Sequence, residues 1–548
     1  MSEMSAGAVL PDNATPSEAP GRSERRSRLV PVLLLIIVIG GVYLLTMHQG
    51  VGRGDSAALQ YNSTVLGLCY PPGYQTEILF GKLFTMLPVG PDPAWRVNLM
   101  QVVFGVIACL AIYGTVLGIT GNVLPGAVAA LTLAFSSIFW SMSTFAEVYV
   151  FYGAFLILGL YCCQRFVSGG RRVWVYLTAL ALGFSIGGRP SELSVLPAFI
   201  PVWVFYRKKV RLTPATIAVC LLLFLLPLGV SVAGYMVHYA DPAASPVWDD
   251  VLGEQIRTGQ PGLPEAKPVP ARLCDAFYYS LGLMWTGRII HADVAARDLW
   301  DYARMLSGVA AFDRIGEDYL ARVLQREHGT GTCIGILGVA LVVWGTIAWR
   351  RQYGWVLLGW GMFVGNLCFY IYNHQVDSRT FIIPGLAGLS VFVGLGTDAL
   401  MRLDGSRVRR AMWPLACLAT PALLLATNWA KVNCNTSGDR LWVHSTEMFA
   451  KAPLPQRCAF VMTPWPGNMC RYVMRVVAGR RDVTIINAQD EWVPKAIDYF
   501  LAYGRSVVVP YYYIGAEDAA VFLQDTPAAI AETGMILITP EGLRRRPG

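Results

Sequence analysis

Long apolar segments recur along almost the whole chain, and they constrain its fold more than any other feature. Each is roughly 18 residues or longer, which as a helix is enough to cross about 30 Å of hydrocarbon. The segments begin at Leu29, Val97, Val123, Val148, Val173, Glu192, Pro214, Cys333, Trp355, Phe381 and Ala411. Because only 15% of the residues are charged, a water-soluble fold is excluded. We therefore predict an α-helical polytopic membrane protein with about eleven transmembrane helices.

Basic residues in the connecting loops predict the orientation. Lys and Arg resist translocation, so short loops that carry them stay in the cytoplasm. With residues 1–28 inside as a disordered tail, the basic clusters all fall on the cytoplasmic side. These clusters are Arg165, Arg171 and Arg172; Arg207, Lys208, Lys209 and Arg211; Arg350 and Arg351; and Arg402, Arg407, Arg409 and Arg410. The net charge of +8 thus reflects mainly topology, and we predict no nucleic-acid partner. We expect a multi-pass protein of a bacterial inner membrane.

The same topology places the larger hydrophilic regions outside. A transmembrane domain at 29–430 then has outer loops at 48–97 and 239–331, and residues 431–548 follow on the outer side. This last region alternates short β-rich runs with helical patterns, which predicts a soluble extracytoplasmic domain with a small parallel α/β layer. It has no glycine-rich phosphate-binding motif, so acceptor docking and a structural cap both stay open.

Two further outer features each leave two interpretations open. The patterns at Leu273–Ile290 and Ala295–Ala311 suit either interfacial helices that border a path for a lipid head group or a folded lid on the bundle. Cys458 and Cys470 either form a disulfide, which can persist outside the cytoplasm, or stay as free thiols.

Two carboxylates stand near the outer ends of predicted helices. Asp55 lies in a glycine-flexed loop just past the first segment, where a carboxylate can approach a ligand closely and act as a general base. The alternative for Asp55 is a helix cap or a solvated side chain. Glu147 lies at the outer boundary of the segment that begins at Val148. A carboxylate at that depth is costly unless it is paired, so Glu147 is a functional candidate, with an ion pair to an outward Arg as the alternative.

Aromatic and basic side chains accompany these carboxylates. Tyr70 and Tyr74 frame a rigid turn at the membrane interface. Arg189 lies in the break Gly187-Gly188-Arg189-Pro190, which makes the two flanking segments either a tight hairpin or one broken helix. Arg379 precedes the segment that begins at Phe381. A guanidinium can bind phosphate through two parallel hydrogen bonds, although snorkelling to lipid phosphates is the alternative for each Arg.

The predicted topology brings these distant segments to one membrane face. Carboxylates and guanidinium groups on a single face are what a substrate linked to a lipid phosphate would require. The candidate site residues are Asp55, Tyr70, Tyr74, Arg96, Glu147, Tyr149, Arg189, His374, Asp377 and Arg379.

The order of these motifs also resembles a known family. The chain reads Gly54-Asp55-Ser56, Pro71-Pro72-Gly73-Tyr74, Trp95-Arg96-Val97-Asn98 and Ala146-Glu147-Val148-Tyr149, with Asp377 before a late segment. This set resembles the protein O-mannosyltransferase-like family of the GT-C glycosyltransferase superfamily, which includes the animal plexin-type O-mannosyltransferases. The resemblance covers residues 52–149 well and the later segments loosely.

The resemblance implies a fold of the GT-C type and an inverting transfer of a sugar, with a mannose-like hexose favoured. The donor would be a polyprenyl-phosphate-linked sugar, and the acceptor a hydroxyl of a protein Ser or Thr, a glycan or a lipid, on the outer face. By similarity Asp55 would be the general base, and Glu147 and Tyr149 would line the same cavity. The outer loops show no compact set of metal ligands, so no cofactor is assigned, although a divalent metal stays an option.

This chain departs from the family at three places. Relatives usually have Asn-His where it has Gly188-Arg189-Pro190, His where it has Tyr70, and Pro where it has Gln75. These departures leave the sugar and the acceptor open.

Two other functions compete with sugar transfer. A transporter or flippase of lipid-linked sugars would also use outward Arg residues and carboxylates, but it predicts a polar path across the bilayer and inverted repeats. A noncatalytic receptor would bind ligands through the C-terminal domain alone. The polar residues concentrate at one face and no repeat is obvious, which favours the transferase.

Overall fold

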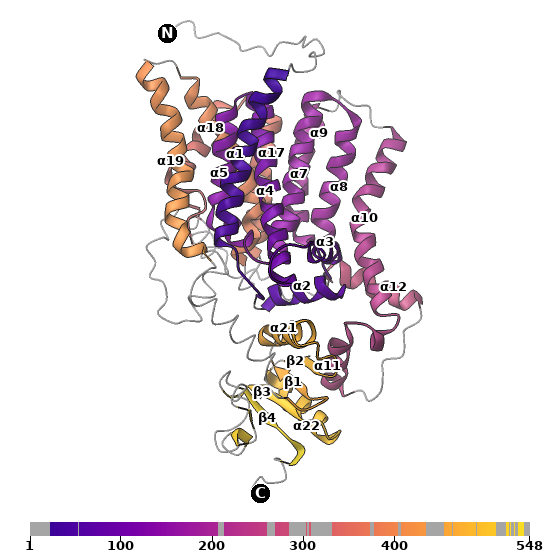
Figure 1. Ribbon diagram of the computed structural model, residues 1–548. Coiled ribbons are helices and arrows are strands. Elements are labelled where there is room, and N and C mark those ends of the chain that lie inside the picture. Colours follow the sequence, from indigo (N-terminus) through magenta and orange to yellow (C-terminus); the bar gives the residue numbers. More distant parts are fainter. Residues whose placement is uncertain are drawn as a thin grey trace.

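The computed structural model gives an α-helical bundle that carries a small α/β domain at one end (Figure 1). The described residues are 22–548 without 53, 207–212, 260–268, 284–302, 304–305, 308–330, 373–377, 404–406, 434–453, 463, 489, 511–521, 525, 528–530, 532–534 and 542–548.

Seven helices in the described part of the chain are long and apolar enough to cross a membrane. They are α1 (Arg22–Thr46), α4 (Pro93–Thr120), α7 (Val148–Gly169), α10 (Pro214–His238), α17 (Tyr353–Tyr372), α18 (Ile383–Met401) and α19 (Arg407–Val432). The shorter apolar helices are α5 (Val123–Phe135), α8 (Arg172–Gly188) and α16 (Gly335–Ala348). With the 3-10 helix η1 (Pro190–Ala198) and α9 (Phe199–Tyr206), each predicted apolar segment corresponds to helical structure. A polytopic helical fold is confirmed, while the number of membrane crossings stays a prediction.

Helix α18 forms the centre of the bundle and is almost wholly buried. Small residues let its neighbours approach closely, which is how helices pack when lipid removes the hydrophobic driving force between them. A Cβ on Gly396 would lie 2.1 Å from the Leu341 carbonyl of α16, and one on Gly394 would lie 3.0 Å from the Pro125 carbonyl of α5.

The break at residues 187–190 is a hairpin. Helix α8 ends at Gly188, Arg189 leaves the helical conformation, and η1 and α9 return along α17. Gly188 is required there because a Cβ would lie 1.9 Å from the ring of Tyr152. Of the two interpretations of the sequence, the broken helix is therefore excluded.

Two short helices, α2 (Gly54–Val65) and α3 (Gln75–Thr85), lie across the end of the bundle that is remote from the N-terminus (Figure 1). A short α6 (Ser137–Met142) precedes α7, and the second outer loop contains η3 (Pro242–Ala244), α11 (Trp248–Thr258) and α12 (Val269–Ser280). The first predicted amphipathic helix corresponds to α12, which begins and ends earlier than expected. Most of the second, Ala295–Ala311, lies outside the described residues.

The C-terminal domain contains a four-stranded sheet in the order β2-β1-β3-β4. Its elements are β1 (Ala459–Met462), α21 (Pro464–Tyr472), the π-helix η7 (Val473–Val477), β2 (Thr484–Asn487), the 3-10 helix η8 (Asp490–Trp492), α22 (Val493–Ala502), β3 (Val507–Pro510) and β4 (Met535–Ile538). Strands β1, β2 and β3 are parallel as predicted, but β4 pairs antiparallel to β3. An antiparallel edge strand is common on otherwise parallel sheets. Cys458 and Cys470 are both buried free thiols.

The domain packs directly on the outer-loop helices. Helix α21 lies against α2, and α11 lies against β2 and α22 (Figure 1). Helix α2, which carries Asp55, thus lies between the bundle and the sheet.

Candidate active site

Asp55 stands in the first turn of α2, and its side chain is exposed. Gly54 before it has a φ of 53°, a left-handed conformation that glycine adopts at little cost. Except for Asp55, the residues of α2 from Gly54 to Ser63 are buried. A rigid buried helix therefore presents this carboxylate at the surface between the bundle and the C-terminal domain.

Asn98 ties the Asp55 loop to the Glu147 loop. Its Oδ1 accepts hydrogen bonds from Gln60 Nε2 of α2 at 2.9 Å and from the Ala146 amide at 2.9 Å. Its Nδ2 donates to the His48 and Gly50 carbonyls at 3.0 and 3.1 Å. Asn98 is fully buried, so these bonds are protected from water. The motif Trp95-Arg96-Val97-Asn98 thus supports the site through its last residue.

Tyr70 and Tyr74 flank the turn that starts α3. The Gly73 amide donates to the Tyr70 carbonyl at 2.8 Å, and the two tyrosine rings contact edge to face at 5.3 Å. Burial raises the pKa of the Tyr70 phenol, and the negative charges of Asp55 and Glu147 raise it further. Both carboxylates therefore lie within electrostatic reach of Tyr70.

Tyr74 lies within electrostatic reach of Asp55 and of a buried guanidinium. The main cause that raises the pKa of Tyr74 is burial, which the positive charge of Arg189 opposes and the negative charge of Asp55 reinforces. Tyr74 itself has a φ of 49° at the N-cap of α3, which costs backbone energy in a residue with a Cβ. The local fold holds this ring in place against that cost.

Arg189 is 4% exposed and is held between two aromatic rings. Its guanidinium carbon lies 4.3 Å from the Tyr149 ring centroid and 4.4 Å from that of Phe381. Its Nη1 donates to Glu192 Oε1 at 3.3 Å. Its Nη2 has no hydrogen-bond partner among the residues that the structure describes, which is costly for a buried charged group. An anionic ligand would satisfy this nitrogen.

Glu77 on α3 is a buried carboxyl that the sequence interpretation missed. It is 1% exposed, and its Oε1 accepts from Gln101 Nε2 of α4 at 2.8 Å. Burial raises the pKa of Glu77 to about 8, although the Gln101 bond and the Arg189 charge act against this shift. Its Oε2 has no hydrogen-bond partner in the described part of the chain. The signal available in the sequence was its place three residues after the Pro71–Tyr74 turn.

An apolar groove begins near Arg189. Phe381, which covers the Arg189 guanidinium, contacts the ring of Phe369 in a tilted arrangement with centroids 5.3 Å apart. Phe369 in turn lines a cavity of about 750 Å³ between η1, α9 and α17. The cavity wall is almost entirely apolar and consists of Ser194, Pro197, Ala198, Pro201, Leu357, Gly361, Val364, Gly365, Cys368 and Phe369. A hydrocarbon chain is the ligand that such a surface accepts best.

The remaining predicted site residues fall elsewhere or outside the described part. Arg96 donates to the Thr85 and Val89 carbonyls at 2.7 and 2.6 Å, so it supports the end of α3, and a substrate contact for it stays a prediction. His374 and Asp377 lie outside the described residues, and for Arg379 only its place in η6 (Ser378–Ile382) is described. Glu147 is the N-cap residue of α7, directly before Val148, and it is partly buried.

In the described part of the chain, no group of three or more His, Cys, Asp or Glu side chains could hold a metal ion.

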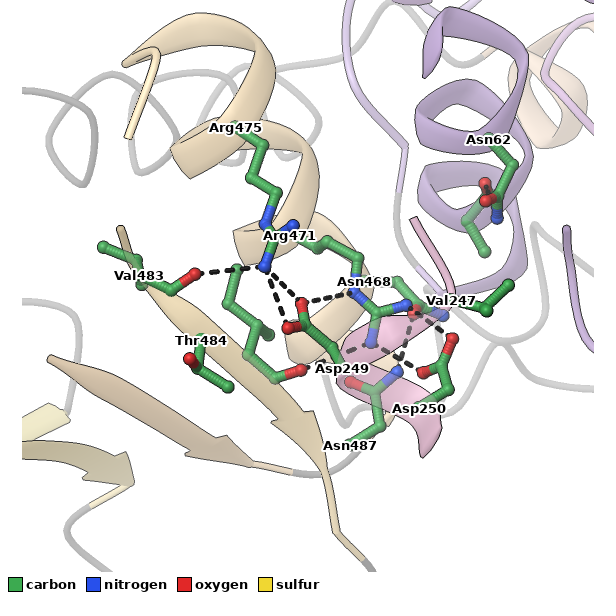
Figure 2. Close-up of polar contacts among 12 residues, drawn as sticks. Asn62, Val247, Asp249, Asp250, Asn468, Arg471, Arg475, Val483, Thr484 and Asn487 are labelled. Atoms are coloured by element: carbon green, nitrogen blue, oxygen red, sulfur yellow. Dashed lines mark hydrogen bonds and ion pairs between the residues drawn. The ribbon is translucent and has the colours of Figure 1, made fainter. Parts of the chain in front are cut away.

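A partly buried ionic cluster joins the predicted second outer loop to the C-terminal domain (Figure 2). Arg471 Nη1 and Nη2 donate to the Asp250 carboxylate at 3.2 and 2.7 Å. Arg475 Nη2 donates to both oxygens of Asp249 at 2.9 and 2.7 Å. Because Asp249 is 1% exposed and Arg471 5% exposed, the interface between α11 and α21 depends on this pairing.

Parts of the chain are similar in sequence to known proteins. Residues 55–213 match the family described as the protein O-mannosyl-transferase TMEM260 N-terminal domain. Protein O-mannosyl-transferase TMEM260 of Mus musculus is 29% identical over 174 residues, which are 31% of this chain and 24% of the mouse protein. The Dictyostelium discoideum protein of the same name is 27% identical over 143 residues, 25% of this chain and 18% of that protein. The chain thus matches about a quarter of these relatives or less.

Solved structures share the fold over most of the chain. ArnT from Cupriavidus metallidurans bound to undecaprenyl phosphate has a TM-score of 0.53 at 12% identity, over 88% of this chain and 93% of ArnT. The Archaeoglobus fulgidus oligosaccharyltransferase tethered with an acceptor peptide has a TM-score of 0.51 at 12% identity, over 93% of this chain and 72% of that enzyme. At this identity the likeness establishes the fold alone.

Proposed function

We propose that this chain, an O-mannosyltransferase-like protein with the GT-C fold, is an inverting glycosyltransferase that uses a sugar linked to a polyprenyl phosphate. The observation that carries the proposal is the position of Tyr74. This ring lies within electrostatic reach of both Arg189, a guanidinium with an unsatisfied buried nitrogen, and Asp55, an exposed carboxylate. A leaving phosphate and an attacking hydroxyl need these two charges on opposite sides of one sugar.

The donor would bind both the apolar groove, through its lipid, and Arg189, through its phosphate. The polyprenyl chain lies in the apolar cavity between η1, α9 and α17, and its phosphate reaches past Phe369 and Phe381 to Arg189. The aromatic rings keep water from the guanidinium, and exclusion of water strengthens a phosphate contact. One structure with the same fold supports this choice, since ArnT from Cupriavidus metallidurans was solved bound to undecaprenyl phosphate.

Transfer would proceed as a single displacement. The acceptor hydroxyl oxygen attacks the anomeric carbon and gives its proton to the Asp55 carboxylate, while the bond from that carbon to the phosphate oxygen breaks and its electron pair leaves with the phosphate. Arg189 stabilises the negative charge that develops on the phosphate. Glu147, Tyr149, Tyr70 and Tyr74 would line the sugar site. Attack opposite to the leaving group inverts the anomeric configuration.

The acceptor is proposed from the names of the curated relatives. A protein Ser or Thr fits the curated relatives, which are named O-mannosyl-transferases, and a glycan or lipid hydroxyl would fit the same chemistry. A mannose-like hexose is the favoured sugar for the same reason. Transfer would take place on the extracytoplasmic face, with the N-terminus in the cytoplasm. The predicted bacterial membrane stays a prediction, since both curated relatives are eukaryotic.

The test is sugar transfer by purified protein in lipid vesicles. Polyprenyl-phosphate mannose serves as donor and a Ser/Thr-rich peptide as acceptor. We expect Asp55→Asn to lower kcat about 10²- to 10⁴-fold, because the general base is lost, with little change in the KM for the donor. The matched control is Asp241→Asn, the same change at an exposed cap of η3 in the second outer loop, which should keep full activity.

The donor site has its own variant pair. We expect Arg189→Gln to weaken donor binding at least tenfold, because a charge-assisted contact to phosphate is lost, whereas Arg257→Gln at an exposed position should not. Wild-type rates in Asp55→Asn would disprove the role of Asp55. If the intact lipid-linked sugar moves across the vesicle membrane and no sugar is transferred to any acceptor, the protein is a flippase and the proposed transferase activity is disproved.

A further inference from the structure

Helix α21 of the C-terminal domain contacts three separate outer segments. Asn468 reaches Gly54 of α2, Tyr472 reaches Ala94 at the start of α4, and Arg471 reaches Asp250 of α11. These segments are far apart in the sequence, and two of them carry motifs of the candidate site. One helix of the soluble domain therefore connects the Asp55 loop, the Trp95–Asn98 motif and the second outer loop.

Asn468 holds the residue immediately before Asp55. Its Nδ2 donates to the Gly54 carbonyl at 3.2 Å, and its Oδ1 accepts from Asn487 Nδ2 of β2 at 2.9 Å. The first bond fixes the orientation of the amide, because the Gly54 carbonyl can only accept and the NH2 group of Asn468 must therefore face it. Gly467 makes this geometry feasible, since a Cβ there would lie 2.0 Å from Asn487 Oδ1.

The Gly54 carbonyl belongs to the same planar peptide group as the Asp55 amide. A bond that fixes this carbonyl therefore fixes the plane from which the Asp55 side chain departs. Gly54 alone would not hold that plane, because it has a left-handed φ of 53° and no side chain to pack, so other φ values are open to it. Asn468 is 8% exposed, so water competes poorly for the bond.

The rest of α21 cannot slide freely along α2. Tyr472 accepts a hydrogen bond from the Ala94 amide at 3.0 Å, and the paired arginines hold α11 through the four contacts to Asp249 and Asp250 described above (Figure 2). A shift of the helix would break two partly buried ion pairs, in which Arg471 and Asp249 are the buried partners, and this is costly because it leaves buried charges without partners. The position of Asn468 is thus set by the second outer loop as well as by the sheet.

We propose that Asn468 is a positioning residue for Asp55, and that α21 couples the second outer loop to the general base. This inference rests on the proposed function, in which Asp55 takes the proton of the acceptor hydroxyl. The soluble domain is then a working part of the transferase site, because it sets the direction of the carboxylate that the membrane domain supplies.

The test uses the full chain in lipid nanodiscs and an isosteric substitution. Asn468→Asp keeps the oxygen that accepts from Asn487, but it places a second acceptor against the Gly54 carbonyl. The matched control is Gln524→Glu, the same amide-to-carboxylate change at an exposed position of the same domain. Asn468→Ala is the second variant and removes the bond without adding charge.

Two readouts are expected to move together. Hydrogen–deuterium exchange of peptides that cover α2 should be faster in Asn468→Asp and Asn468→Ala than in wild type and Gln524→Glu. The kcat of both Asn468 variants should fall at least tenfold, since a small misplacement of a catalytic group is enough for that, with the KM for the donor within about twofold. A general loss of folding would instead raise exchange throughout the C-terminal domain. It would also lower both the amount of active protein and its capacity to bind the donor.

Opposite results separate this inference from the proposed function. Unchanged exchange in α2, or a full kcat in both Asn468 variants while the wild type transfers sugar, overturns the positioning role and leaves the transferase intact. If the wild type transfers no sugar, the catalytic role falls with the proposed function, whereas faster exchange in the variants still supports the contact between Asn468 and Gly54.

Discussion

At the residue scale, the site combines two charges of opposite sign with a carboxyl that burial keeps protonated. The guanidinium of Arg189 is held in apolar surroundings by two aromatic rings and by the carboxylate of Glu192. Glu77 lies close enough for the Arg189 charge to affect its pKa, yet that pKa stays near 8. At neutral pH Glu77 is therefore mostly a neutral hydrogen-bond donor, and a sugar hydroxyl or a phosphate oxygen is a group to which it can donate.

Glu77→Gln should change how stability depends on pH. The pKa of Glu77 rises from its ordinary value near 4.5 to about 8 in the folded protein, so the unfolded chain releases this proton first. The wild type should therefore lose stability as pH rises from about 4.5 to about 8, and Glu77→Gln should lose less over that range. Thermal unfolding of both proteins at pH 5 and pH 8 measures the difference, and parallel pH dependences would disprove it.

Individual residues were predictable only where their surroundings could be inferred from local sequence. Arg189 stood out because an arginine in a Gly-Gly-Arg-Pro break between apolar segments has few structural roles. Glu77 did not, because its partner Gln101 is on another helix and nothing local shows that α3 is buried. Asn98 was noticed within its motif, but its bonds to Gln60, Gly50 and Ala146 depend on the packing of three segments.

At the element scale, the α11–α21 contact should fail when one charge is removed. Asp249→Asn removes the buried negative charge that accepts two hydrogen bonds from Arg475 in η7, the continuation of α21. Because Asp249 is buried and Arg475 only partly so, we expect a cost of about 3 kcal/mol, the lower end of the range for buried pairs. The matched control is Asp482→Asn, which breaks the more exposed pair with Arg480 and should cost at most about 1 kcal/mol. Limited proteolysis of the C-terminal domain across a temperature series compares the two, and equal losses would contradict the prediction.

Helices and strands could be predicted from the sequence where the membrane or a regular hydrophobic pattern determines them. The apolar segments were predictable because a membrane requires about 20 apolar residues for each helical crossing. The direction of β4 was not, since the pattern that predicts a strand contains no information on its partner, and the segment that joins it to β3 is longer than any other connection within the sheet. The hairpin at Arg189 was one of two interpretations, and the tight contact of Gly188 with Tyr152 excluded the other.

At the scale of the whole molecule, the proposed function places a lipid-linked donor along one path from the apolar cavity to the C-terminal domain. On this proposal, η1, α9 and α17 would hold the lipid, Arg189 would bind the phosphate, and α2, which packs against α21, would carry the base. No single segment contains these parts, so only the packed bundle defines the order in which a donor would meet them.

This path predicts a chain-length effect for a substitution in the groove. Val364 lines the cavity, so Val364→Trp should fill part of it and raise the KM for a long polyprenyl-phosphate donor about tenfold, which corresponds to about 1.4 kcal/mol. A short-chain analogue that ends before Val364 should keep its KM, because its phosphate and sugar contacts are unchanged. The matched control is Val219→Trp on α10, where Val219 is 40% exposed outside the cavity. An equal effect on long and short donors, or an equal effect of both Trp variants, would place the lipid elsewhere.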